Sequence, residues 1–158
     1  MPERHSAPLL VVQASPDYAQ RISSHCPEVV FLATPDRAEQ LHAAGFHALA
    51  ADLSDPRSTL AIAADYGLRQ RLHYAGITCF VCEYLPLTAL LAEGLGLSFA
   101  SVQSTCQMRN KAQSAQVWQR AGLAVPISRL IANWRDLDEF ATAHAAPWIL
   151  KPVDGTGS

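Results

Sequence analysis

The chain has 158 residues, enough for one domain or for one domain and part of a second. Its 49% hydrophobic and 16% charged residues are typical of a packed soluble protein, and its net charge of −2 gives no indication of nucleic acid or of an anionic membrane surface as a partner. No apolar run approaches the roughly 18 residues of a membrane span, and the run from Leu9 to Val12 is too short for a signal-peptide core. We therefore expect a cytoplasmic protein.

The first hundred residues alternate between short apolar runs and helical patterns. Gly, Pro, Asp and Ser separate these segments, as expected at turns and at helix ends. Strands are predicted over residues 9–13, 29–33, 46–51 and 77–82, with a weaker candidate over 97–102. Helices are predicted over residues 17–25, 35–44, 56–66, 68–75 and 86–95, and Gly67 is expected to break the third of them.

Each predicted strand is a continuous apolar run, and strands alternate strictly with helices. This pattern is typical of a parallel sheet that helices cover on both faces. The sequence therefore predicts an α/β fold with a doubly wound, mostly parallel, Rossmann-like sheet, and the most apolar strand, 77–82, is expected at its centre. Ligands of such sheets bind at the carboxyl ends of the strands. Glu83 directly follows strand 77–82 and is a candidate substrate-side residue, the alternative being a solvated acid at a helix entrance.

The composition changes near Ser101, where a polar, turn-rich stretch begins. We predict one domain over residues 1–102 and the incomplete start of a second over residues 103–158. Within the second, Asn110 and Asn133 are expected to cap helices, and Asn110 has capping-box spacing to Gln113. The predicted elements are helices over 111–121 and 134–145 and strands over 127–132 and 148–153. The residues expected on the inner faces of the two helices are Ala115, Trp118 and Gly122, and Leu137, Phe140 and Ala141.

Lysine occurs only at Lys111 and Lys151, although the chain has ten arginines. Lys111 lies in the first turn of a predicted helix, where the helix dipole disfavours a cation by a few tenths of a kcal/mol. Lys151 shares one face of a predicted strand with Ile149 and Val153, where a cation is unfavourable unless an anion meets it. The alternative for each is a solvated surface lysine. A bound anion would account for both, since helix N-termini attract anions.

The last residues, 154–158, read Asp-Gly-Thr-Gly-Ser, the composition of a loop whose backbone N–H groups can surround a phosphate. They do not form a Walker A motif, because there the lysine follows the glycines, whereas Lys151 precedes them. A dinucleotide fingerprint is also excluded, because no glycine occurs in residues 13–17 after the first strand. The alternative interpretation is an unstructured tail.

Four cysteines, Cys26, Cys79, Cys82 and Cys106, are dispersed along the chain, and a disulfide framework is not expected at this dilution. Cys79 and Cys82 form a C-x-x-C pattern inside the predicted strand 77–82. Strand geometry would place their sulfur atoms on opposite faces, so we expect both to be reduced, buried and metal-free. The six histidines show no metal-ligand spacing either.

The second half of the chain resembles the opening of an ATP-grasp domain. The resemblance rests on Lys111 at the head of a helix, on the run 121–126 (AGLAVP), and on the runs 147–152 (PWILKP) and 154–158 (DGTGS). Biotin carboxylase, D-alanine–D-alanine ligase, glycinamide ribonucleotide synthetase and the L-amino-acid ligases share this order. Residues 1–102 resemble the preATP-grasp domain that precedes it in those enzymes. One departure is Asn110, where many members have Asp.

The resemblance implies a set of nucleotide-binding residues. In the family, two lysines contact the nucleotide phosphates and a glycine-rich loop closes over them. The matching residues here are Lys111, Lys151, Gly155, Thr156, Gly157 and Ser158. The adenine-contacting strand and the Mg²⁺ ligands of the family come later in its sequences, so no metal ligand or catalytic residue is assigned within this chain.

The implied function is ligation of a carboxylate to an amine, or to a thiol, with ATP and Mg²⁺. The carboxylate would attack the γ-phosphate to give an acyl phosphate and ADP, and the nucleophile would then displace phosphate. An L-amino-acid ligase is the preferred subfamily and a homodimer a further expectation. The 158 residues by themselves are expected to be inactive. The competing hypothesis is a free-standing, non-catalytic α/β interaction or regulatory module.

Overall fold

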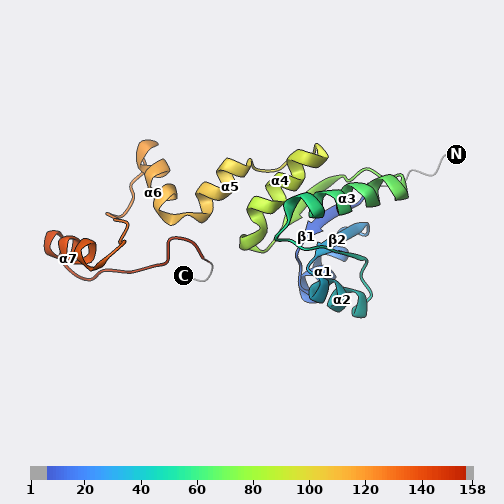
Figure 1. The fold of residues 1–158 in the computed structure, drawn as a ribbon, viewed down its shortest axis with the longest axis horizontal. Coiled ribbons are helices and arrows are strands. Elements are labelled where there is room, and N and C mark those ends of the chain that lie inside the picture. Colours follow the sequence, from blue (N-terminus) through green and yellow to red (C-terminus); the bar gives the residue numbers. More distant parts are fainter. Residues whose placement is uncertain (1–6, 156–158) are drawn as a thin grey trace. The chain divides into compact units, whose positions relative to one another are not determined.

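Four parallel strands form one sheet in the computed structural model, which describes residues 7–155 (Figure 1). The strands are β1 (Leu9–Val12), β2 (Val29–Ala33), β3 (Ala48–Ala50) and β4 (Gly76–Cys79), in the spatial order β3-β2-β1-β4. Val12 at the end of β1 is in register with Leu32 of β2 and with Cys79 of β4. The predicted α/β fold with a parallel sheet is confirmed.

Helices cover both faces of this sheet. They are α1 (Pro16–Ser23), α2 (Pro35–Ala43), α3 (Pro56–Gln70) and α4 (Leu85–Leu95), with a 3₁₀ turn η1 (Cys82–Tyr84) before α4. Because successive side chains of a strand point to opposite faces, Val11 and Phe31 pack with α1 and α2, whereas Leu10 and Leu32 pack with α3 and α4. The sheet is therefore doubly wound, as predicted.

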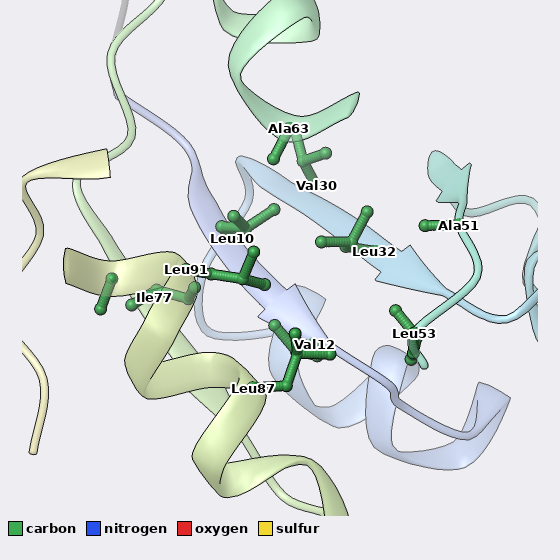
Figure 2. Packing of buried hydrophobic residues seen from close by; sticks show 11 residues of the cluster. Leu10, Val12, Val30, Leu32, Ala51, Leu53, Ala63, Ile77, Leu87 and Leu91 are labelled. Atoms are coloured by element: carbon green, nitrogen blue, oxygen red, sulfur yellow. The ribbon is translucent and has the colours of Figure 1, made fainter. Parts of the chain in front are cut away.

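The core on the α3 and α4 side is the larger of the two (Figure 2). Figure 2 shows side chains of β1 and β2 directed toward the two helices, and the labelled residues are Leu10, Val12, Val30, Leu32, Ala51, Leu53, Ala63, Ile77, Leu87 and Leu91. Gly94 allows α3 and α4 to approach, because a Cβ atom there would lie 2.6 Å from Leu60 Cδ2. Gly94 lies within α4, and the helix ends at Gly96, which has φ 67°.

The predicted central position of the fourth strand is wrong. Within residues 7–155, β4 pairs only with β1 and forms one edge of the sheet, while β1 and β2 are central. The strand is also shorter than expected, because the chain leaves the sheet after Cys79 and the apolar residue Phe80 is half exposed. Apolarity predicted a central strand here, but much of the burial of Ile77 comes from packing against α4.

The expected helix break at Gly67 is also wrong. α3 continues to Gln70 and ends at Arg71, which takes the left-handed conformation with φ 52°. Gly67 is buried, and a Cβ atom there would contact the Leu72 carbonyl and the Tyr74 ring. Both distances, 3.5 Å and 3.7 Å, are ordinary van der Waals contacts. Gly67 therefore lies inside the helix rather than ending it, and no separate helix follows it over residues 68–75 in the described chain.

The candidate fifth strand, residues 97–102, does not form in the described chain. Leu97 and Phe99 pack against the core as alternate residues of an edge strand would, but no strand pairs with them among the described residues. Helix α5 (Val102–Arg109) begins where the sequence predicted a polar, turn-rich stretch. The chain divides into two compact units within α5, between Thr105 and Cys106.

The second unit contains α6 (Lys111–Arg120) and α7 (Trp134–Ala143), each preceded by its predicted asparagine cap. The Asn133 side chain accepts a hydrogen bond from Asp136 N–H, and the Asp136 carboxylate accepts one from Asn133 N–H, which completes a capping box. Leu137, Phe140 and Ala141 share the less exposed face of α7, as predicted. Trp118, expected to point inward from α6, is half exposed instead.

The two strands predicted in the second unit, 127–132 and 148–153, are extended but unpaired in the described residues. Figure 1 shows α7 with such extended chain on both sides of it. Their side chains are also exposed, including 73% of Ile127 and 81% of Ile149. A strand needs a hydrogen-bonding neighbour, and the described part of this unit supplies none.

The cysteine expectations hold only in part. All four cysteines are free, and Cys79 is half-buried, which raises the pKa of its thiol. Cys82 is exposed, contrary to prediction, because it begins the turn η1 rather than continuing strand β4.

Candidate functional site

The N-terminus of α6 is built by its capping residue. Asn110 has an extended backbone, and its Oδ1 accepts a hydrogen bond from Gln113 N–H at 3.0 Å. Ser114 Oγ donates to the Gln107 carbonyl at 2.8 Å, which ties the first turn of α6 to the end of α5. Asn110 therefore fills the capping role at the start of α6.

Lys111 connects this helix start to the glycine-rich end of the chain. Its backbone N–H donates to the Val153 carbonyl at 2.9 Å, and its Nζ donates to the Gly155 carbonyl at 3.3 Å. The two contacts join residues more than 40 positions apart. The structure thus brings together the helix-leading lysine and the start of the loop, which the sequence alone placed in separate elements.

Lys151 lies two residues before Val153 on the segment that Lys111 contacts, and its side chain is exposed. No contact between Lys111 and Lys151 is recorded among the described residues. The predicted strand that was to place Lys151 beside Ile149 and Val153 on one face is absent. The two lysines therefore lie on segments that are joined by the hydrogen bonds of Lys111 to Val153 and Gly155.

Gly155 is the only residue of the predicted loop that the structure describes, and Thr156, Gly157 and Ser158 lie outside the described residues. Gly155 has φ 127°, a backbone conformation that side-chain-bearing residues rarely adopt. Open space surrounds the position that a Cβ atom would take, so the backbone conformation, rather than crowding, favours glycine here.

This arrangement is suited to an anion. The Lys111 and Gln113 N–H groups of the first turn already donate to Val153 and Asn110, so this turn contributes mainly the positive end of the helix dipole. Lys111 adds an ammonium group with three donors, of which Gly155 receives one. Lys151 adds a second positive charge on the adjoining segment. Backbone N–H groups of a glycine-rich turn would complete such a site for phosphate.

Glu83 belongs to the first unit, at the carboxyl side of the sheet. It lies in η1, four residues beyond the end of β4, and its side chain is exposed. The strand order reverses direction between β1 and β4, and the crevice at such a switch point is where ligands bind in open α/β sheets. The structure places Glu83 after one of the two strands that border this point.

Sequence reasoning missed Gln13, which follows β1 at the same edge. Its backbone takes φ 53°, a left-handed conformation that is uncommon for a residue with a side chain. Gln13 Oε1 accepts a hydrogen bond from Thr34 N–H at 3.2 Å, so the end of β1 is tied to the start of α2. The sequence offered one sign of this role of Gln13, which is a polar residue directly after a buried strand.

An exposed aromatic pair also escaped prediction. Tyr18 of α1 and Phe80 after β4 stack with ring centroids 5.7 Å apart and an interplanar angle of 18°. Both rings are half exposed. They come from the segments that follow β1 and β4, so the stack spans the two elements that border the switch point. Only the tertiary fold brings them together, because they are 62 residues apart in sequence.

The described residues hold neither a candidate metal site nor a candidate membrane span. Residues 7–155 contain no group of three or more His, Cys, Asp and Glu side chains that could hold a metal ion. Nor does that part of the chain contain a helix long and apolar enough to cross a membrane.

Solved structures share this fold over nearly the whole chain. An L-amino acid ligase from Bacillus licheniformis matches 95% of it with a TM-score of 0.67 and 18% sequence identity. The biotin carboxylase domain dimer of 2-oxoglutarate carboxylase from Hydrogenobacter thermophilus, in complex with MgADP, ADP and bicarbonate, matches 94% with a TM-score of 0.62 and 20% identity. The fold is that of ATP-grasp enzymes.

The match extends over less than half of each ATP-grasp neighbour. The chain spans 38% of the L-amino acid ligase and 35% of the biotin carboxylase domain. Neither a protein-family model nor a curated protein matches the sequence. At these identities the similarity establishes the fold, which confirms the resemblance seen in the sequence, and both neighbours are ATP-dependent ligases.

Proposed function

We propose that this chain is the N-terminal portion of an ATP-dependent ligase that joins a carboxylate to an amine, or to a thiol, through an acyl phosphate. An L-amino-acid ligase is the preferred type. The observation that carries the proposal is the contact of Lys111 with Val153 and Gly155, which joins a helix N-terminus to the glycine-rich segment. The fold shared with two ATP-dependent ligases supports it.

In this proposal the two units have different tasks. Residues 1–102 form the preATP-grasp domain and residues 103–158 begin the ATP-grasp domain. Lys111, Lys151 and the loop from Gly155 to Ser158 bind the nucleotide phosphates and offset their negative charge. Glu83, at the switch point of the sheet, lies on the substrate side.

Mg²⁺ would neutralise charge on the phosphates when bound. Its ligands are proposed to lie outside this chain, and residues of this chain would hold only the nucleotide. The role of the described residues is thus electrostatic and positional: the ammonium groups and loop amides fix the phosphates, and no covalent step is assigned to them.

Lysine substitutions in the full-length ligase test the proposal. Losing a charge-assisted phosphate contact costs about 1.5–3 kcal/mol, which is roughly a ten- to hundredfold loss of affinity. We expect Lys111→Ala and Lys151→Ala each to weaken ATP binding by that factor in calorimetry. Lys151→Arg should have a smaller but clear effect, because a planar guanidinium does not replace a compact ammonium.

The matched control is Arg120→Ala, which removes a cation from the far end of the same helix α6. It should leave ATP affinity unchanged, and circular dichroism should show that every variant stays folded. If both lysine variants bind ATP like the wild type while folded, Lys111 and Lys151 are surface lysines and the proposed site is wrong.

The isolated 158-residue chain should not turn over ATP, because it holds only the lysine side of the proposed site. Phosphate release measured with purified chain and Mg²⁺ should equal the background. Turnover that Lys151→Ala abolishes would show that the site is more complete than we propose.

A further inference from the structure

Cys79 and Cys82 lie at the junction of β4 and the turn η1, where the chain leaves the sheet. In a continuous strand their Cα atoms would be about 10 Å apart, beyond the span of about 4.4–6.8 Å that a disulfide requires. β4 instead ends at Cys79, the chain bends at Phe80 and Val81, and Cys82 begins η1. The bend shortens the separation, so the strand argument against a thiol pair no longer applies, and the C-x-x-C spacing is that of redox motifs.

The Cys79 side chain turns toward this bend. Its thiol donates a hydrogen bond to the Val81 carbonyl at 3.1 Å, and Val81 N–H donates to the Cys79 sulfur at 3.4 Å. The sulfur of Cys79 thus lies against the residue that directly precedes Cys82. The same Val81 carbonyl accepts a hydrogen bond from Tyr84 N–H at 3.0 Å, which closes the turn that carries Cys82.

The two thiols are electrostatic neighbours in different surroundings. Burial has the largest effect and raises the pKa of the Cys79 thiol, whereas its hydrogen bonds with Val81 and Thr88 lower it. The nearby Cys82 and Glu83 raise it again, so this pKa lies above its ordinary value. A half-buried thiol that stays protonated reacts slowly with oxidants. Cys82 is exposed and is therefore the thiol that an oxidant in solution reaches first.

We propose that Cys79 and Cys82 form a reversible redox site, which hydrogen peroxide oxidises to a disulfide and a dithiol reduces. The Cys82 sulfur attacks one peroxide oxygen, which gives a sulfenic acid and releases water. The Cys79 sulfur then attacks the Cys82 sulfur: the S–S bond forms, the S–O bond breaks, and the hydroxyl leaves with the Cys79 proton as a second water. The two sulfurs together lose two electrons to one molecule of peroxide.

A metal ion is the other ligand that a C-x-x-C pair can indicate. A pair of thiolates leaves a tetrahedral zinc site short of ligands, and residues 7–155 contain no group of three or more His, Cys, Asp and Glu side chains that could hold a metal. Neither Cys26 nor Cys106 has another cysteine within three positions in sequence. These observations favour a local thiol pair at Cys79 and Cys82.

Thiol counting and peptide mapping of the 158-residue chain test the site. After treatment with a small excess of hydrogen peroxide, Cys79 and Cys82 should be lost from the free thiols counted in denaturant, and dithiothreitol should restore them. Chymotrypsin cleaves after Phe80, so the bridge should appear as peptides 75–80 and 81–84 held together until reduction. The variant Cys26→Ser/Cys106→Ser keeps only the pair and should form the same bridge.

Single substitutions separate the roles of the two thiols. Cys79→Ser leaves Cys82 without a resolving partner, so dimedone should trap its sulfenic acid about tenfold more than in the wild type. In Cys82→Ser, the half-buried Cys79 should lose its thiol about tenfold more slowly than in the wild type. The matched control is Cys106→Ser, which removes an exposed cysteine outside the pair and should leave bridge formation unchanged. Circular dichroism should show that every variant stays folded.

Three outcomes would overturn the inference. The first is that Cys79 and Cys82 both remain free thiols in peroxide while folded. The second is a bridge that joins either of them to Cys26 or Cys106 instead. The third is equal dimedone labelling of Cys82 in the wild type and in Cys79→Ser, which would show that Cys79 does not resolve the sulfenic acid.

Discussion

Strand β2 and the segment 148–153 are both short apolar runs, yet their environments are opposite. In β2, Phe31, Leu32 and Ala33 are almost fully buried between helices on both faces, with β1 and β3 on either side. In the second segment Ile149 and Leu150 are among the most exposed large apolar residues of the described chain. Since the two runs have similar composition, their difference in burial comes from the elements that surround each run.

Helices do not show this contrast. α1 in the first unit and α7 in the second each begin at a capping residue, Ser15 and Asn133, and have nearly the predicted length. Helix hydrogen bonds close within one segment, whereas a strand bonds only with another strand. Among the described residues, the first unit thus holds both helices and a sheet, whereas the second holds helices without a sheet.

The largest expected effect is the loss of stability that follows when the core of the first unit is disrupted. Leu91→Ala removes a fully buried side chain from the cluster of Figure 2 and should lower the free energy of unfolding by about 2–5 kcal/mol. Ile149→Ala, the matched change in the second unit, should alter it by less than about 0.5 kcal/mol. Urea unfolding followed by circular dichroism measures both. Equal losses would mean that Ile149 is buried in solution and that the contrast between the units is wrong.

A smaller effect is expected from the caps. Asn133→Ala removes the capping box of α7 and should destabilise that helix by about 1 kcal/mol. Because α7 has no buried residue to hold it, carbon chemical shifts of residues 134–143 should move toward coil values. Ser15→Ala at the start of α1 is the comparison, since buried Ala19 anchors that helix to the core. Equal loss of helix at both sites would show that tertiary packing does not distinguish the units.

The smallest expected effect is a change in the stability of the first unit with pH. Burial, and then the neighbouring Tyr66, raise the pKa of Tyr74 from 10.0 to about 12, and its hydroxyl donates to the Ala63 carbonyl at 2.8 Å. The unfolded chain releases this proton near pH 10 while the folded state keeps it, so stability should fall as pH rises from about 10 to 12.

Tyr74→Phe isolates that contribution. The difference in stability between the wild type and this variant should shrink across the same pH range, and the ultraviolet titration of tyrosinate should lose its latest phase. A difference that is independent of pH would show that Tyr74 is not sheltered by the core.

The sequence by itself determined the elements whose bonds are local. It predicted α6 and α7 and their asparagine caps, the apolar runs of β1 and β2, and the alternation that implies a doubly wound sheet. It also singled out Lys111, because a cation at a helix N-terminus is unfavourable by itself. The resemblance to ATP-grasp enzymes followed from motifs of this local kind.

Tertiary structure alone decided everything that depends on distant neighbours. It placed β4 at an edge, brought Leu60 of α3 against Gly94 of α4, stacked Tyr18 on Phe80 and joined Lys111 to Gly155. It also left 127–132 and 148–153 unpaired, against prediction. The physical reason is the same in each case: burial and strand pairing are properties of two segments that meet in space, and a single run of residues encodes only one of the two.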